Sequence, residues 1–305
     1  MTFRIIAGTL AIALACSAAH GASLRVPFDF SQSAIGLDVT VKDTPLYMIL
    51  DTGVDPSVID LGRAEALGLK IDRTAGGEAS GEGDAKQAQA FPTTIDRLAI
   101  RGRNFTAIDA LAVDMGPLSA RYGRTLDGVL GYSFLTDKIV LIDYANRTLG
   151  ILDRPADAIP AVRTCRKRWS VTLRSFEGDS IPVIPGFRFG AASAPITLDT
   201  GSNGGIALYQ AALDLPGLHA ALAEKGETSS TGARGDMKSK TYVLNMPVGF
   251  GPFTLPAGEI VTLRAVQGSS DTRLANIGNK LFAAMKLKML LDYRARQMTF
   301  YGDCR

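Results

Sequence analysis

Short runs in which apolar and polar residues alternate dominate the chain, and they predict a mostly β protein. Successive side chains of a strand point to opposite faces, so such alternation indicates strands that bury one face. The alternating segments are residues 24–30 and 36–41 in the first half and 169–173 and 181–184 in the second. Two further segments, 59–69 and 208–223, have apolar residues at helical spacing and predict one short helix in each half.

The first 22 residues have the features of a secretory signal. Arg4 precedes an apolar run over residues 5–15, and small residues around Ala19 then provide a cleavage site. The run is too short to span a bilayer, and no later stretch approaches the roughly 20 apolar residues required. We therefore expect an exported protein, periplasmic or secreted, without a membrane span. A lipid anchor at Cys16 and a buried N-terminal helix are the alternatives.

The rest of the chain presents the same landmarks twice in the same order. Met-Ile-Leu-Asp-Thr-Gly ends at Gly53, and Ile-Thr-Leu-Asp-Thr-Gly ends at Gly201. A short segment follows each about 80 residues later and closes on a glycine, Gly131 or Gly278, before an apolar run that ends in Asp-Tyr. Landmarks repeated in matching order indicate a duplicated unit. We therefore expect the two halves to fold as near-copies of one mostly β unit with a short helix.

The expected domain boundaries follow from this duplication. They are a signal peptide at 1–22, an N-terminal lobe at 23–153, an inter-lobe linker at 154–168 and a C-terminal lobe at 169–305. The linker contains two prolines and ends in a basic run, which we interpret as a solvated surface, with a processing site or an acidic partner as the alternative.

Charge and histidine content exclude several classes of function. The chain has 33 Lys and Arg residues against 30 Asp and Glu, a net charge of +3, which gives no electrostatic reason to expect a nucleic acid partner. Its two histidines are His20, inside the predicted signal, and His219. A histidine-rich metal site is excluded, and a Ser-His-Asp triad would depend on His219 alone.

Two cysteines remain after the signal, Cys165 and Cys304. A pair of cysteines in an exported chain predicts one disulfide, which would tie the end of the chain to the start of its second half. Two free thiols in a reducing compartment are the alternative.

The repeated Asp-Thr-Gly carries the candidate chemistry. Glycine allows a tight turn and close approach of another backbone, so an apolar strand ending this way presents a carboxylate at a sheet end. If the halves pack about a pseudo-twofold axis, Asp51 and Asp199 meet between them. Two carboxylates in contact share one proton over a range of pH. One could then accept a proton from a water that attacks a peptide carbonyl, while the other donates to the developing oxyanion.

A duplicated Asp-Thr-Gly with later closing glycines resembles the aspartic peptidase family in its bilobal, pepsin-like arrangement. The resemblance implies a mostly β, bilobal fold with two pseudo-twofold-related β lobes and short helices. The turn around Asp51 is similar to the retroviral type, and the short halves resemble bacterial exported aspartyl-protease-like proteins. The resemblance covers about residues 24–301. One departure is that the glycine-rich loop over residues 76–90 contains no tyrosine, which pepsin-like enzymes usually carry on the flap over the substrate.

The resemblance implies a role for each matching residue. Asp51 and Asp199 would be the catalytic dyad, and the glycines that follow would let the two turns approach. The supporting residues it implies are Thr52 and Thr200 as an inter-lobe hydroxyl grip, Gly53 and Gly201 for close backbone approach, and Ser202 as a hydrogen-bond donor to the outer oxygen of its aspartate. Val54 occupies the position in the first half that corresponds to Ser202, and its apolar side chain cannot donate a hydrogen bond to Asp51.

The expected function is that of an aspartic endopeptidase, a monomer that binds an extended peptide or protein substrate in a cleft between its lobes. Water is the nucleophile, so no metal or organic cofactor is expected. A non-catalytic peptide-binding module on the same fold is the alternative, and a hydrolase that uses His219 is a third possibility. Arg121, Tyr122 and Arg124 lie in a segment that either borders the cleft or is solvated surface.

Overall fold

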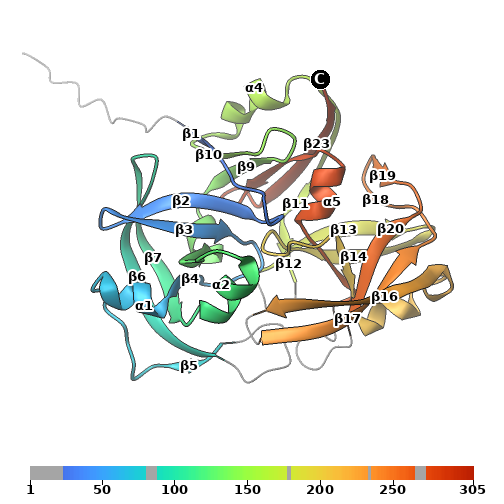
Figure 1. The fold of residues 1–305 in the computed structure, drawn as a ribbon. Coiled ribbons are helices and arrows are strands. Elements are labelled where there is room, and N and C mark those ends of the chain that lie inside the picture. Colours follow the sequence, from blue (N-terminus) through green and yellow to red (C-terminus); the bar gives the residue numbers. More distant parts are fainter. Residues whose placement is uncertain (1–22, 80–87, 177–179, 233–234, 265–272) are drawn as a thin grey trace, which may run out of the picture.

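A computed structural model of the chain describes residues 23–79, 88–176, 180–232, 235–264 and 273–305. The secretory signal predicted for residues 1–22 lies outside the described residues. The described part is mostly β with few short helices, as predicted, and it is built from three sheets (Figure 1).

A seven-stranded sheet forms the core of the N-terminal lobe, in the order β2-β3-β8-β4-β7-β6-β5. Its strands are β2 (Ile35–Val41), β3 (Thr44–Leu50), β4 (Ser57–Asp60), β5 (Gly77–Glu78), β6 (Gln89–Ile100), β7 (Arg103–Val113) and β8 (Gly128–Leu130). Three helices accompany it, α1 (Leu61–Ala66), α2 (Gly116–Tyr122) and α3 (Tyr132–Leu135).

A ten-stranded sheet forms the core of the C-terminal lobe, in the order β16-β17-β20-β15-β21-β14-β13-β18-β19, with β12 paired to β13. Its strands are β12 (Arg174–Ser175), β13 (Pro182–Phe189), β14 (Ala192–Leu198), β15 (Ile206–Leu208), β16 (Leu222–Gly232), β17 (Gly235–Leu244), β18 (Val248–Phe250), β19 (Phe253–Leu255), β20 (Glu259–Arg264) and β21 (Ala275–Ile277). Its helical segments are η2 (Gln210–Asp214), η3 (His219–Ala221) and α5 (Asn279–Ala284).

The strand orders of the two lobes match, which confirms the predicted duplication. The N-terminal order β2-β3-β8-β4-β7-β6-β5 corresponds strand for strand to β13-β14-β21-β15-β20-β17-β16. The directions also agree, because β3 is parallel to β8 as β14 is to β21, and β4 is parallel to β7 as β15 is to β20. Of the strands in the described part of the chain, β12 and the β18–β19 hairpin alone lack a counterpart in the N-terminal sheet.

A six-stranded sheet joins the two lobes and receives three strands from each half, in the order β1-β10-β9-β22-β23-β11. It lies at the top of Figure 1, with one lobe below it on each side. Its strands are β1 (Leu24–Pro27), β9 (Ile139–Asp143), β10 (Thr148–Leu152), β11 (Cys165–Thr172), β22 (Lys288–Asp292) and β23 (Gln297–Cys304). The central pair, β9 and β22, is antiparallel with Leu141 opposite Leu290. Every residue of both strands is buried.

The segment between β10 and β11 contains two short helical turns, η1 (Pro155–Ala158) and α4 (Ile159–Val162). The predicted disulfide is present between Cys165 and Cys304, which face each other across β11 and β23. It closes a loop with a sequence separation of 139 residues. On the chain-entropy account, a loop of this length stabilises the folded state by about 4–5 kcal/mol.

The helix predicted for residues 208–223 is wrong. The segment contains the two separate 3-10 turns η2 and η3, because Pro216 and Gly217 interrupt it, with Leu215 extended and Gly217 at a φ of 77°. The helix predicted for 59–69 is present but shorter. Asp60 Oδ1 caps α1 by accepting from Arg63 N at 2.9 Å.

A buried ion pair links the two halves at the centre of the shared sheet. Lys288 Nζ of β22 lies 2.6 Å from Asp143 Oδ2 of β9, and the two side chains are only 7% and 4% exposed. The Asp143 carboxylate also accepts from the backbone and side-chain nitrogens of Asn146 at 3.0 and 2.8 Å. Its charge is therefore both paired and hydrogen-bonded, the condition under which a buried charge is tolerated.

Lys288→Met should lower the free energy of unfolding by about 3–5 kcal/mol, because it leaves the buried Asp143 carboxylate without its counter-charge. Denaturation in urea measures the loss. The matched control is the double variant Lys288→Met/Asp143→Asn, which removes the charge but keeps an acceptor oxygen for Asn146. This double variant should recover at least half of the lost stability. If both variants lose the same amount, the ion pair is not the cause.

Candidate active site

The two Asp-Thr-Gly turns leave equivalent strands. Asp51 follows β3, and its backbone N donates to Leu130 O of β8 at 3.0 Å. Asp199 follows β14 and makes the same bond to Ile277 O of β21 at 2.9 Å. Each aspartate is thus held by a parallel neighbouring strand that the closing glycine directly follows, which explains why both motifs recur together in each half.

A reciprocal hydrogen-bond pattern between Thr52 and Thr200 joins the two turns. Thr52 Oγ1 donates to Leu198 O at 3.0 Å and accepts from Thr200 N at 3.1 Å. Thr200 Oγ1 donates to Leu50 O at 3.0 Å and accepts from Thr52 N at 3.0 Å. Both threonines are buried, so each hydroxyl satisfies two backbone groups that water cannot reach. The four bonds fix the turns face to face across the seam between the lobes.

The glycines permit this approach. A Cβ atom on Gly201 would lie 2.0 Å from Asp51 Oδ2, and one on Gly53 would lie 3.0 Å from Asp199 Cγ. Both values are below van der Waals contact, so any side chain at either position would displace a carboxylate. The structure thus brings together Asp51, Asp199 and the flanking threonines and glycines that the sequence singled out.

The Asp51 carboxyl is buried and only 8% exposed. Loss of hydration raises its pKa well above 3.8, and the neighbouring Asp199 carboxylate raises it further through charge repulsion and a side-chain hydrogen bond. The backbone N–H groups of Gly53 and Gly201 donate to Asp51 Oδ1 at 2.7 and 3.1 Å and act in the opposite direction. Burial is the largest cause, so Asp51 favours its protonated form.

The Asp199 carboxylate has a richer set of donors. Gly201 N and Ser202 N donate to its Oδ1 at 2.8 and 3.0 Å. Asn276 Nδ2 donates to its Oδ2 at 2.6 Å. Asn276, on β21, is a residue that the sequence reasoning missed. The signal that could have revealed it is its place two residues before Gly278, where the first half has the apolar Val129.

Ser202 contacts Asp199 differently from the expectation. Its backbone N, not its hydroxyl, donates to the carboxylate, and its Oγ accepts from Gly204 N at 3.4 Å. The side-chain donor that the resemblance placed at Ser202 is supplied by Asn276. Val54, the counterpart of Ser202, contributes its carbonyl oxygen, which accepts from Tyr132 N at 2.7 Å.

Each turn is supported by the residue after its closing glycine. Asn279 Nδ2 donates to Thr200 O at 2.6 Å, and Asn279 Oδ1 accepts from Tyr144 OH at 2.8 Å. On the other side, Tyr132 packs edge-on against Tyr293 with ring centroids 6.0 Å apart. Tyr144 and Tyr293 are the tyrosines of the two Asp-Tyr landmarks. Each contacts the residue that follows the closing glycine of the other half, Tyr144 contacting Asn279 and Tyr293 contacting Tyr132.

A second connection between the lobes runs through α2. The hairpin of β16 and β17 extends from the C-terminal lobe toward α2, on the side of the molecule away from the shared sheet (Figure 1). Arg121 Nη2 of α2 donates to Ser229 O of β16 at 3.0 Å. Arg124 stacks on the Tyr47 ring at 3.4 Å. Arg121 and Arg124 therefore both have specific partners. The glycine-rich loop without tyrosine lies partly outside the described residues, because 80–87 are not described.

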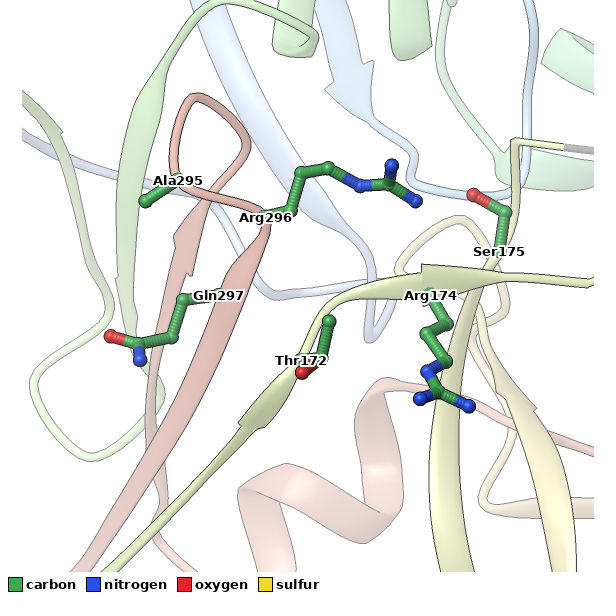
Figure 2. A pocket seen from close by; sticks show the side chains of 6 residues that line it. All are labelled: Thr172, Arg174, Ser175, Ala295, Arg296 and Gln297. Atoms are coloured by element: carbon green, nitrogen blue, oxygen red, sulfur yellow. The ribbon is translucent and has the colours of Figure 1, made fainter.

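An open hollow of about 650 Å³ lies apart from the dyad and is lined by Thr172, Arg174, Ser175, Ala295, Arg296 and Gln297. In Figure 2 the Arg296 side chain extends toward Ser175, whereas Arg174 points away on the other side of β12. The two guanidinium groups therefore do not converge on one ligand.

Over the described ranges, no group of three or more His, Cys, Asp or Glu side chains is arranged to hold a metal ion. In the same part of the chain, no helix has the length and apolar character needed to cross a membrane. His219 is exposed at the start of η3.

Asp51→Asn should stabilise the fold near neutral pH, since a neutral amide avoids the cost of burying a charged carboxylate. The pKa of Asp51 in the folded state lies above 3.8. The contribution of Asp51 to the free energy of unfolding is therefore fully present below about pH 3.8, and it is lost as the pH rises through the raised pKa. Thermal unfolding should therefore show a higher Tm for the variant near pH 7 and little difference near pH 3.5. An equal difference at both pH values would contradict the raised pKa.

Comparison with known proteins agrees with this geometry. Residues 37–134 match the sequence model of the family described as "Aspartyl protease". No curated protein matches the chain significantly. A retropepsin-like aspartic protease from Rickettsia conorii aligns with 20% identity and a TM-score of 0.32, over 43% of this chain and 98% of its own. Basic 7S globulin from soybean aligns with 12% identity and a TM-score of 0.48, over 93% of this chain and 95% of its own.

At these TM-scores the two structures carry no argument of their own. The family match covers the first Asp-Thr-Gly turn, and the lobe that follows repeats the same strand order and the same turn. In its sequence over residues 37–134 and in its duplicated fold, the chain resembles aspartic peptidases.

Proposed function

We propose that this protein is an aspartic endopeptidase that hydrolyses peptide bonds with a water molecule held between Asp51 and Asp199. The observation that carries the proposal is the reciprocal Thr52–Thr200 pattern, because it brings the two carboxyls to one seam. A pair of carboxyls with unequal environments supplies an acid and a base at the same pH.

The proposed reaction begins with Asp51 protonated and Asp199 ionised. Asp199 accepts a proton from the water, whose oxygen attacks the peptide carbonyl carbon, while Asp51 donates its proton to the carbonyl oxygen. The tetrahedral diol collapses as the carbon–nitrogen bond breaks. One diol hydroxyl returns its proton to Asp51, and Asp199 gives its proton to the leaving nitrogen. The products are a carboxylic acid and an amine, and the dyad regains its initial state.

The substrate would be an extended peptide in a cleft between the lobes. Among the described residues, β16 is an outer strand of the ten-stranded sheet and β5 an outer strand of the seven-stranded sheet, so each has a row of backbone groups without a neighbouring strand there. Such edges can pair with an extended chain through backbone hydrogen bonds. Pockets along the cleft would then bind alternate side chains of the substrate peptide and give specificity.

The protein would act outside the cytoplasm, in the periplasm or secreted, as a monomer. The Cys165–Cys304 disulfide supports this location, since such bonds persist in oxidising compartments. Residues 1–22 would be removed as a signal peptide. The mature chain would comprise lobes at 23–153 and 169–305 joined by 154–168.

Asp51→Asn and Asp199→Asn should each reduce cleavage of an unbiased peptide library at least a thousandfold, on the order expected when a proton-transfer group is removed. Mass spectrometry of the digest measures the loss. Asp38→Asn is the matched control, because Asp38 is an exposed carboxylate on β2, and it should cleave at the wild-type rate. His219→Ala should also retain full activity.

Unchanged cleavage in either dyad variant would refute the aspartic mechanism. Loss of activity in His219→Ala would point to a different hydrolase. If the wild-type protein binds peptides of the library but cuts none between about pH 3 and 8, it is a peptide-binding module on this fold.

A further inference from the structure

The two halves of the dyad site differ at two buried positions. Beside the first turn, β3 and β8 place the apolar Ile49 and Val129 opposite each other. At the equivalent pair beside the second turn, β14 and β21 carry Thr197 and Asn276, both 1% exposed. A buried amide needs partners for its donors and its acceptor, so this polar pair costs stability unless it is fully used.

Both ends of the Asn276 amide have a partner. Its Nδ2 lies 2.6 Å from Asp199 Oδ2, and its Oδ1 lies 2.9 Å from Thr197 Oγ1. The Thr197 hydroxyl is also 2.9 Å from Ala275 O, so it can donate to that carbonyl or to Asn276 Oδ1. When it donates to Asn276 Oδ1, it directs the NH₂ group of the amide toward Asp199. That orientation is favourable only if Asp199 Oδ2 is an acceptor, as it is when the carboxylate is ionised.

The donors to the two aspartates are unequal as a result. Asp199 accepts from three N–H donors, the backbone nitrogens of Gly201 and Ser202 and the Asn276 amide. Asp51 accepts from Gly53 N and shares the Gly201 N–H with Asp199 at the longer distance of 3.1 Å. Donors to a carboxylate favour its charged form, so the charge of a singly protonated dyad belongs on Asp199.

We propose that Asn276, oriented by Thr197, is a positioning residue that holds the negative charge of the dyad on Asp199 and leaves the shared proton on Asp51. Its consequence for catalysis rests on the proposed peptidase function, but the distribution of the proton does not. With Asn276 in place the C-terminal aspartate is the base that takes the proton from water. The N-terminal aspartate is the acid that protonates the carbonyl oxygen.

The amide also sets the pH range of the dyad. Stabilising the ionised carboxylate keeps one negative charge on the pair to lower pH, so the active form persists further into the acid range. Removing the donor should move the acidic limb of the pH profile upward, by about one to two pH units for a hydrogen bond to a charged group.

The other titratable groups around the site keep their protonation state over this range. Burial raises the pKa of Tyr144 and Tyr293, and it raises the pKa of Tyr209 to about 12, so all three remain neutral. The Arg273 guanidinium lies over the Tyr209 ring, 5.0 Å from its centroid. The pH dependence between acid and neutral conditions therefore belongs to the two aspartates.

The test is a pair of titrations on Asn276→Val, which places the residue of the first half at the equivalent position. The ¹³Cγ shifts of the two aspartates, assigned with Asp51→Asn and Asp199→Asn, report ionisation directly and need no activity. In the wild type Asp51 should stay protonated at a pH where the dyad has already lost its first proton. In Asn276→Val the first ionisation should move upward by about one to two pH units. The acidic limb of the pH dependence of kcat/KM should move with it.

Thr197→Val and Thr197→Ser keep the test independent of one substitution. Thr197→Val removes the hydroxyl that orients the amide and should shift the first ionisation in the same direction by a smaller amount. Thr197→Ser retains the hydroxyl and should titrate like the wild type. Thermal unfolding of each variant confirms that it is folded.

If Asn276→Val is folded and its first ionisation does not move, Asn276 has only a structural role and the inference is wrong. The inference is also wrong if the first ionisation of the wild-type dyad appears at the Asp51 carboxyl. A wild type that shows the expected ¹³C titration but cleaves no peptide would instead refute the proposed function and leave the proton assignment standing.

Discussion

The hydroxyl of one buried threonine in each half holds the site together. Thr52 and Thr200 each bond to the backbone of the opposite turn, so neither turn has its polar groups satisfied without the other. Buried donors and acceptors without partners are costly, and this cost fixes the relative position of the lobes where the carboxyls meet. The shared six-stranded sheet brings the halves together, and the hydrogen bonds of the two threonines fix how the two turns face each other.

Onto this near-symmetric frame the chain places an asymmetric polar shell. The backbone donors around Asp51 and Asp199 come from the turn that both halves repeat, whereas Asn276 and Thr197 belong to one half alone. A strictly symmetric pair would share its proton equally. The asymmetry of this pair lies in a few side chains next to the carboxyls. The seven strands of the N-terminal sheet all have counterparts in the same order in the C-terminal sheet.

The parts of this structure that the sequence predicted are those encoded locally or by repetition. The Asp-Thr-Gly turns, the closing glycines and the disulfide followed from short motifs and from the presence of two cysteines. What it missed depends on contacts between distant segments. Asn276 was not recognised because it stands in an otherwise apolar closing stretch, 77 residues from the carboxylate it contacts. Arg121 meets Ser229 across 108 residues. The helix expected at 208–223 is wrong because Pro216 and Gly217 break it into two 3-10 turns, although its apolar residues have helical spacing.

The central pair of the shared sheet has a consequence for the integrity of the chain. β9 and β22 are buried along their whole length and are each other's neighbours, one from each half. A half-chain separated from the other after a nick between the lobes would expose its five-residue central strand, with one row of backbone groups open to solvent. Such an uncovered edge is a template for pairing with another chain. A separated half would therefore tend to self-associate through this strand, and the covalent joining of the two halves protects the protein from that outcome.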